Sequence, residues 1–366
     1  MNNMEVRMKG IDQMKKRVFA GLLLVLAPFV LAGCGKPYLS VLRPAGEVGE
    51  KQLKLIVLTL FVMAFVVVTV VTIYLIILLR FRRKKEDGIP KQVEGSTKLE
   101  IIWTAIPILI VLGLGIPTIY YTAVFGDVSG MEQVDEDGNR KNLVINVRAN
   151  LYWWEFEYPD YGIVTSQDLI VPTDEKIYFN LIASDVKHSF WIPSAGGKMD
   201  TNTDNENRFY LVFDSEKADE AGNLFYGKCA ELCGPSHSYM DFKVKAVSRE
   251  QFDAWVKAMQ SDEGPELTSD LAVKGQRLFE QNNCLACHAV TAKDERPASA
   301  RIAPNLADFG NRSRVAGYLQ YNKENIKNWI RHPEEYKPGN KMYKEANFTD
   351  QELDALAEYL MSLKVQ

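Results

Sequence analysis

Residues 229–240 read CAELCGPSHSYM and bring two thiols, an imidazole and a thioether into one short segment. Cys229 and Cys233 are followed by His237 and Met240. Soft sulfur together with imidazole suits copper, and two cysteines at this spacing can each bridge two metal ions. A mononuclear copper site needs only one cysteine. The motif therefore predicts a dinuclear copper centre.

Such a centre needs a second imidazole, and His188 is the only other histidine of the surrounding region. Two other interpretations stay open. Cys229 and Cys233 could form a disulfide in an exported protein, or two cysteines and two histidines could bind zinc. A disulfide leaves His188, His237 and Met240 unexplained, and methionine suits copper better than zinc.

The residues around the motif have the pattern of an all-β domain. Segments rich in β-branched and aromatic residues at 143–148, 176–183, 208–213 and 242–247 are separated by clusters of Gly, Pro, Asn and Asp. Short strands separated in this way are typical of a sandwich or barrel. We expect residues 127–260 to form this domain.

Two uncharged apolar runs, Leu55–Leu79 and Ile101–Phe125, precede the β region. Each is longer than the roughly 20 residues that cross a bilayer as a helix. A short loop rich in positive charge stays in the cytoplasm, and the loop between the runs contains Arg80, Arg82, Arg83, Lys84, Lys85, Lys91 and Lys98. We expect a two-pass hairpin within residues 34–126, with everything after about Asp127 outside the cytoplasm.

The start of the chain has the features of an export signal. Positive residues at 15–17 precede the uncharged run Val18–Leu31, and small residues follow. The ending Leu-Ala-Gly-Cys resembles a bacterial lipobox, in which Cys34 would be lipidated and become the mature N-terminus. We therefore expect residues 1–33 to be removed. A plain signal or an uncleaved anchor is the alternative.

The last hundred residues differ in composition from the β region. Residues 261–266 have the character of a linker, and helical periodicity follows at 272–281, 325–330 and 350–363, where strands are hard to find. We expect residues 267–366 to form a small all-α domain.

This domain contains C-x-x-C-H, a haem c attachment motif, at Cys284, Cys287 and His288. Two thiols at this spacing can add to the two vinyl groups on one edge of haem, and the histidine can bind its iron. A Pro-Gly-x-x-Met sequence ends at Met342, and a methionine opposite histidine raises the potential of the iron. A chance motif or a redox dithiol, with Met342 as core filler, is the alternative.

Both halves of the chain resemble known families. The region from Leu55 to about Val247, including LEIIWTAIP at 99–107, resembles cytochrome c oxidase subunit two with its copper A centre. The last hundred residues resemble class I cytochrome c, and the whole chain is similar to the fused subunit two of bacterial caa-type oxidases. The resemblance implies a multi-domain membrane protein with a two-helix transmembrane hairpin, an all-β cupredoxin-like sandwich or barrel, and an all-α class I cytochrome c domain.

The resemblance also implies roles for individual residues. Copper A would be held by the backbone carbonyl of Glu231 and by five side chains. These side chains are those of His188, Cys229, Cys233, His237 and Met240. The Glu231 carboxylate would reach magnesium at the interface with the catalytic subunit. Haem c would be attached through Cys284 and Cys287, with His288 and Met342 as axial ligands. Glu100 would lie near the mouth of a proton pathway, unless it is an ordinary interfacial charge.

The implied function is electron entry into a respiratory terminal oxidase. Electrons from an external cytochrome c-type donor would pass through haem c and copper A to haem a in catalytic subunit 1. Subunit 1 would reduce oxygen to water and pump protons, with subunit 3 beside it. Four histidines are too few to build the oxygen-reducing centre in this chain as well. The formal net charge of −4 and the lack of a basic stripe make nucleic acid an unexpected partner.

Three other functions stay open at this point. They are the copper A subunit of a nitric oxide reductase, a membrane-tethered electron carrier, and a quinol oxidase subunit two, which would lack the copper ligands. One departure from the family also matters. The usual W-Y-W-x-Y-E-Y stretch reads YWWEFEY at 152–158, so Tyr152 replaces the tryptophan at which a free cytochrome c delivers electrons. We expect the fused domain to make that docking site unnecessary.

Overall fold

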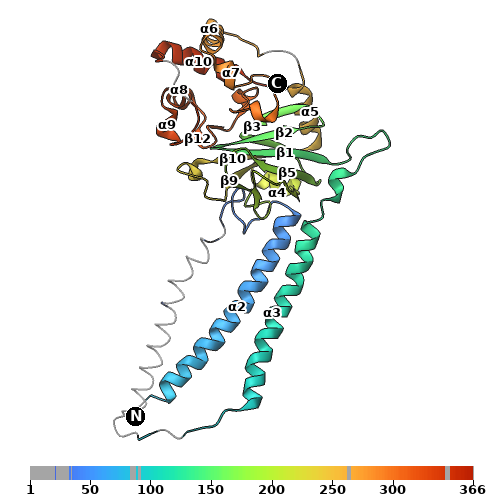
Figure 1. Cartoon of the computed structure of the whole chain (residues 1–366), viewed down its shortest axis with the longest axis vertical. Helices are drawn as coiled ribbons and strands as arrows, with labels where there is room; N and C mark the ends of the chain where they lie inside the picture. Colours follow the sequence, from blue (N-terminus) through green and yellow to red (C-terminus); the bar gives the residue numbers. More distant parts are fainter. Residues whose placement is uncertain are drawn as a thin grey trace, which may run out of the picture.

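The computed structural model describes residues 21, 33, 35–82, 88–89, 92–261, 265–342 and 347–365. In chain order these form a helical hairpin, a β sandwich and a helical domain that packs on the sandwich (Figure 1). Cys34, the predicted lipidation site, and almost all of the predicted export signal lie outside the described residues.

The hairpin consists of α2 (Glu47–Arg80) and α3 (Thr97–Phe125), which run side by side away from the sandwich (Figure 1). Both are long and apolar enough to cross a membrane. Large apolar side chains remain exposed along both helices, as expected where lipid is the solvent. Pro107 and Pro117 lie inside α3, and membrane helices tolerate such interior prolines.

Helix α2 begins at Glu47, before the apolar run Leu55–Leu79, and its first turn packs against the sandwich. Val48 and Gly49 are buried there. A side chain at Gly49 would lie 2.8 Å from the carbonyl oxygen of Ser194, so only glycine allows this close approach. The amide of Ala45 donates a hydrogen bond to the same carbonyl at 2.6 Å. These contacts fix the hairpin to the base of the sandwich.

The β domain consists of two five-stranded sheets, ordered β3-β2-β1-β5-β8 and β4-β10-β9-β6-β7. The strands are β1 (Leu143–Asn150), β2 (Trp153–Tyr158), β3 (Ile163–Ser166), β4 (Asp168–Pro172), β5 (Ile177–Ala183), β6 (His188–Trp191), β7 (Met199–Thr201), β8 (Asn207–Leu211), β9 (Leu224–Cys229) and β10 (Asp241–Val247). The β1–β5 and β4–β10 pairs are parallel, and the other pairs are antiparallel. Helices α4 (Ser215–Glu220) and α5 (Arg249–Met259) complete this part.

Aromatic side chains fill the space between the sheets. The rings of Phe190 and Phe242 stack with centroids 4.7 Å apart, and Trp154 meets Phe190 edge-on. All three side chains are fully buried. Such aromatic pairs add to the stabilisation from burial alone. Phe190 of this core lies on β6 and pairs with Cys229 at the end of β9, so the core lies beside two of the predicted copper ligands.

The C-terminal domain contains α6 (Asp270–Gln281), α7 (Cys284–Cys287), α8 (Lys323–Arg331), α9 (Pro333–Tyr336) and α10 (Asp350–Ser362). Helices α6 and α10 pack closely, since a side chain at Gly275 would lie 2.0 Å from the Ala355 carbonyl oxygen. The domain also has one short pair of strands, β11 (Arg314–Val315) and β12 (Leu319–Gln320). Two residues are too few to show a strand period in sequence.

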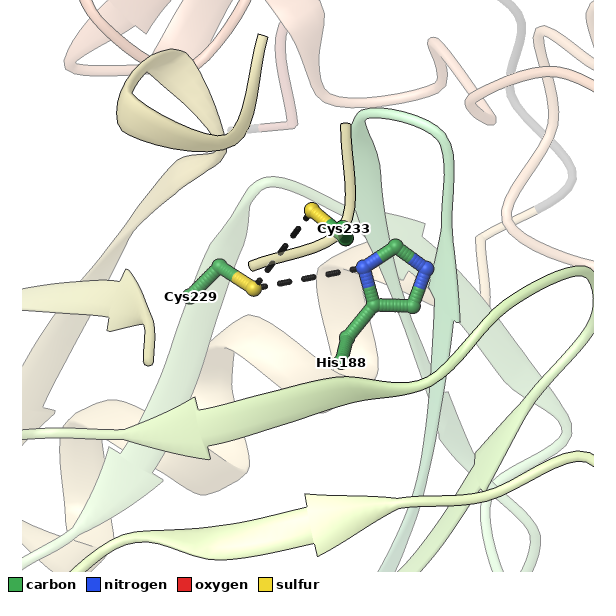
Figure 2. A group of neighbouring side chains, drawn as sticks. All are labelled: His188, Cys229 and Cys233. Carbon is green, nitrogen blue, oxygen red and sulfur yellow. Dashed lines mark hydrogen bonds between the residues drawn. The ribbon is translucent and has the colours of Figure 1, made fainter. Parts of the chain in front are cut away.

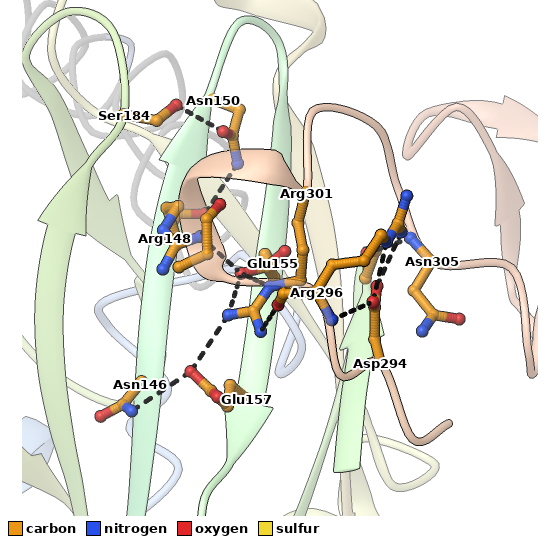
Figure 3. A network of polar contacts seen from close by, with 12 residues as sticks. Asn146, Arg148, Asn150, Glu155, Glu157, Ser184, Asp294, Arg296, Arg301 and Asn305 are labelled. Atoms are coloured by element: carbon orange, nitrogen blue, oxygen red, sulfur yellow. Dashed lines mark hydrogen bonds and ion pairs between the residues drawn. The ribbon is translucent and has the colours of Figure 1, made fainter. Parts of the chain in front are cut away.

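A buried polar network joins this domain to the sandwich (Figure 3). Arg301 lies 3.1 Å from a Glu155 oxygen and 3.2 Å from Glu157, and Arg148 donates to the Ala298 carbonyl at 2.6 Å. Burial raises the pKa of Glu155, although Arg148 and Arg301 oppose the shift. Charges are buried in this way only when they are paired. The helical domain is therefore docked on the sandwich by specific contacts.

Candidate metal centres

The two cysteines of residues 229–240, the ligand loop, face each other and His188. Cys229 ends β9, His188 begins β6, and Cys233 lies in the turn toward β10. The Cys229 sulfur is 3.9 Å from the Cys233 sulfur and 3.9 Å from Nδ1 of His188 (Figure 2). Both thiols are free, and their separation far exceeds the roughly 2.05 Å of a disulfide bond. The disulfide interpretation therefore does not describe this structure.

The other predicted copper ligands surround the same two sulfurs. Nδ1 of His237 lies 3.6 Å from the Cys233 sulfur, and the Met240 sulfur lies 3.9 Å from it. The Glu231 carbonyl oxygen is 3.3 Å from the Cys229 sulfur. Each copper ligand predicted from sequence thus lies beside one of the two thiols.

The ligand loop has its shape because the chain turns sharply after Cys233. Gly234 has a φ of 137°, which residues with a side chain rarely adopt. A side chain there would also lie 2.4 Å from the Tyr152 hydroxyl. The loop then makes a 3₁₀ turn at His237–Tyr239, after which Met240 is fully buried. The Trp154 indole donates to the Met240 carbonyl at 3.3 Å and so ties the end of the loop to the core.

Asp185 orients His188 and was not identified from the sequence. Its Oδ1 lies 3.0 Å from Nε2 of His188, so Nε2 donates and Nδ1 keeps a lone pair directed at the sulfurs. Burial favours the neutral acid, but hydrogen bonds from His188 and from the Leu151 and Val186 amides prevail and lower the Asp185 pKa to about 2. An acidic residue three positions before a candidate ligand was the available signal.

The donor set fits copper better than zinc. Two cysteines and two histidines satisfy zinc, but a buried thioether lies beside them in Met240, and thioether sulfur is a copper ligand. The hydrogen bond between the thiols lowers the pKa of Cys229 and raises that of Cys233. Metal binding to cysteine requires the thiolate form, so binding at this pair releases protons.

The predicted haem attachment residues lie on one helical turn. Cys284 and Cys287 are the first and last residues of α7, so their side chains share one face. Nδ1 of His288 lies 2.7 Å from the Pro304 carbonyl oxygen. Because Nδ1 donates there, Nε2 is left free to bind a metal. Burial lowers the pKa of His288, which favours the neutral, metal-binding imidazole.

The remaining predicted site residues lie on other segments. Met342 is half-buried, and its amide donates to the Asn340 side chain at 2.8 Å. The Glu231 side chain is half-buried beside the ligand loop. Glu100 lies exposed in the first turn of α3.

A membrane hairpin, a sandwich with a sulfur-rich ligand cluster and a docked domain with a haem attachment motif together define a membrane-bound electron-transfer protein. Family models match all three parts. "Cytochrome C oxidase subunit II, transmembrane domain" matches residues 44–120, the periplasmic domain of the same family matches 163–247, and cytochrome c matches 272–364.

Relatives extend over almost the whole chain. It is 58% identical over 340 residues to cytochrome c oxidase subunit 2 of Bacillus sp. (strain PS3), which covers 92% of this chain and 95% of the relative. It is 57% identical to cytochrome c oxidase subunit 2 of Bacillus subtilis (strain 168), over 94% of this chain and 97% of the relative. Quinol oxidase subunit 2 of Bacillus anthracis is 34% identical, with 70% of this chain and 86% of the relative covered.

The chain belongs to the cytochrome c oxidase subunit II family and is the electron-entry subunit of a haem–copper oxidase. The predicted family and the predicted three-part fold are confirmed. The copper A and cytochrome c parts imply that copper A and haem c are its cofactors. The quinol oxidase alternative is disfavoured, because that similarity covers less of the chain and the copper ligand set is intact.

Proposed function

We propose that this chain accepts single electrons from a cytochrome c-type donor at haem c and passes them through a dinuclear copper A centre to the catalytic subunit. One observation carries the proposal: two unjoined thiols are surrounded by two imidazoles, a thioether and a carbonyl, in a domain against which the haem-bearing domain is docked. The proposed domains are residues 34–126, 127–260 and 267–366, with a linker at 261–266.

The copper ligands in this proposal are His188, Cys229, Glu231 through its carbonyl, Cys233, His237 and Met240. When bound, the copper pair supplies a carrier that takes up and releases one electron. The protein holds the ligands in place beforehand, because Asp185 fixes the His188 ring and Trp154 fixes the Met240 main chain. Ligands that do not move lower the reorganisation that each transfer requires.

The haem ligands in this proposal are Cys284 and Cys287 as covalent attachments and His288 and Met342 at the iron. Haem c supplies the first one-electron carrier when it is attached. The Pro304 carbonyl keeps Nδ1 of His288 protonated, which directs the other nitrogen to the metal. Histidine and methionine together favour a high reduction potential, suited to accepting electrons from a small cytochrome.

The placement in the membrane completes the proposal. The hairpin crosses a bacterial cell membrane twice, with its basic loop in the cytoplasm and both redox domains outside. Subunit 1, with haem a and the haem–copper site, reduces oxygen to water and pumps protons, with subunit 3 beside it. The Glu231 carboxylate binds magnesium at the subunit interface, Glu100 lies near a proton pathway, and Cys34 carries a lipid.

Stopped-flow spectroscopy of the purified complex tests this function. Mixing with a reduced small cytochrome c should reduce the c-type haem of this chain first and then bleach the near-infrared copper band, with oxygen consumed afterwards. A nitric oxide reductase would consume nitric oxide in place of oxygen. Copper reduction that precedes haem c reduction would contradict the proposed order.

A further inference from the structure

The segment Lys337–Met342, the bridge segment, connects the predicted haem axial ligand with the ligand loop of the copper site. The Ser236 hydroxyl of the ligand loop donates a 2.8 Å hydrogen bond to the Pro338 carbonyl of the bridge segment. Ser236 is fully buried and directly precedes His237. A path of covalent bonds and one hydrogen bond therefore links Met342 to His237.

A second contact from the bridge segment reaches the other copper-site histidine. The Lys341 ammonium lies 3.3 Å from Oδ2 of Asp185, and the other oxygen of that carboxylate holds Nε2 of His188 at 3.0 Å. Lys341 is the residue directly before Met342. The bridge segment thus contacts a neighbour of each histidine of the copper site.

The bridge segment also covers Tyr152, where a free donor would be expected to enter. The buried Lys337 ammonium donates to the Tyr152 carbonyl at 2.8 Å. A side chain at Gly339 would lie 3.4 Å from the Tyr152 hydroxyl and 3.2 Å from Pro235. Tyr152 is only 4% exposed, so the protein's own haem domain occupies this entry point.

We propose that the bridge segment is the electron-transfer contact between haem c and copper A, and that Ser236 is the positioning residue that holds it against the ligand loop. This inference rests on the proposed function and adds its internal route. The haem-bearing domain loses one electron and the copper site gains it, so no bond is made or broken and no proton moves. Lys341 and Asp185 form a second, more exposed contact.

One hydrogen bond across the same boundary lies away from both predicted metal sites. The Ser313 hydroxyl donates a 2.8 Å hydrogen bond to Asp168, equal in length to the bond between Ser236 and Pro338. Asp168 and Ser313 are not adjacent in sequence to any predicted metal ligand. The Ser313 hydroxyl is therefore a control for Ser236, because its bond crosses the same boundary but does not lie on a path between the two metal sites. The Ser313 amide also donates to the same Asp168 oxygen at 3.0 Å, so Ser313→Ala removes one of two bonds.

Laser-flash kinetics on the purified oxidase complex test the proposal. A photoexcited ruthenium complex injects one electron into the c-type haem, and the decay of the reduced haem band is followed together with bleaching of the copper band. Ser236→Ala should slow this transfer several-fold, whereas Ser313→Ala should leave it near the wild-type rate. Lys341→Gln should slow it by less than Ser236→Ala, because the Lys341 side chain is exposed.

Amide hydrogen exchange gives a readout that does not depend on electron transfer. Ser236→Ala should accelerate exchange in the bridge segment and the ligand loop, and Ser313→Ala should accelerate it near residues 311–315. The haem and copper absorption bands and both reduction potentials should stay at wild-type values, which separates a lost contact from a lost metal. If Ser236→Ala disturbs the copper band, the transfer rate of Lys341→Gln is compared with those of the wild type and Ser313→Ala instead.

Two results would overturn the proposal that the bridge segment is the electron-transfer contact. One is an unchanged transfer rate in both Ser236→Ala and Lys341→Gln, and the other is equal slowing in Ser236→Ala and Ser313→Ala. A wild-type complex whose copper takes no electron from haem c would instead overturn the proposed function. The two failures are therefore distinguishable.

Discussion

The fold positions the two cysteine pairs of this chain in different ways. Cys229 and Cys233 face each other at 3.9 Å, and their partner ligands already lie around them. Cys284 and Cys287 share a single helical turn, while the proposed axial ligands His288 and Met342 come from separate segments. The predicted copper ligands come from two strand ends and one loop, whereas the predicted haem ligands come from a helical turn and a segment more than fifty residues further along the chain.

This difference shows how each site depends on the fold. Ligands that the fold alone positions need little rearrangement when a metal binds. A site completed by a covalent group adds the binding free energy of that group to the folding of its domain. Loss of copper should therefore leave the sandwich folded, whereas loss of haem should destabilise the helical domain.

The largest expected effect is that of Cys229→Ser. Serine removes a thiolate that is proposed to bridge the copper ions, and a hydroxyl does not replace it as a soft copper ligand. The near-infrared copper band should disappear, and the c-type haem spectrum and circular dichroism should remain. Copper retained at the wild-type stoichiometry would contradict the assigned role of Cys229.

Replacement of a haem-attaching cysteine should have the converse effect. Cys284→Ser removes one of the two proposed covalent links, so the helical domain should lose part of its haem and unfold at a lower temperature. Copper content should be unchanged because the copper ligands come from the sandwich. Haem spectra, copper analysis and differential scanning calorimetry measure these three quantities, and an unchanged haem content with an unchanged unfolding temperature would count against attachment at Cys284.

A smaller effect, on the stability of the protein, is expected at the boundary between the sandwich and the helical domain. Arg301→Met leaves Glu157 and the buried Glu155 without their shared partner (Figure 3). Breaking a buried ion pair from one side costs about 3–5 kcal/mol, and Arg148, 3.2 Å from Glu155, should reduce that loss. Urea unfolding of the full chain in detergent measures the change. The double variant Arg301→Met/Glu155→Gln should recover part of it, and an unchanged midpoint in the single variant would show that the pair does not hold the domains together.

The smallest expected effect is a pH dependence from Lys337. Burial lowers the Lys337 pKa to about 7. Between this pKa and the ordinary lysine value of about 10.4, the unfolded chain binds a proton that the folded chain does not. The free energy of unfolding should therefore gain a contribution that rises with pH above about 7 and is constant below it. Lys337→Met should lack this rise when urea unfolding is compared at pH 7 and 9, and parallel pH curves would contradict it.

Local patterns in the sequence were enough to propose both ligand sets, because most of the candidate ligands lie in two short motifs, residues 229–240 and 284–288. The docking contacts were not predictable in this way. Arg301 and Glu155 are 146 residues apart, and Lys337 and Tyr152 are 185 apart. No periodicity relates such residues, because their contact depends on how two folded domains pack. Asp185 is only three residues from His188 in the sequence, but its role could not be predicted because it depends on the direction in which the His188 ring points.

Metal analysis of the full-length protein, purified with its partner subunits from its own host, tests the central claim most directly. The account predicts two copper ions for each covalently attached haem, no zinc, and a near-infrared band from the copper pair. Zinc at this site, or a bond between the Cys229 and Cys233 sulfurs in the mature protein, would contradict it.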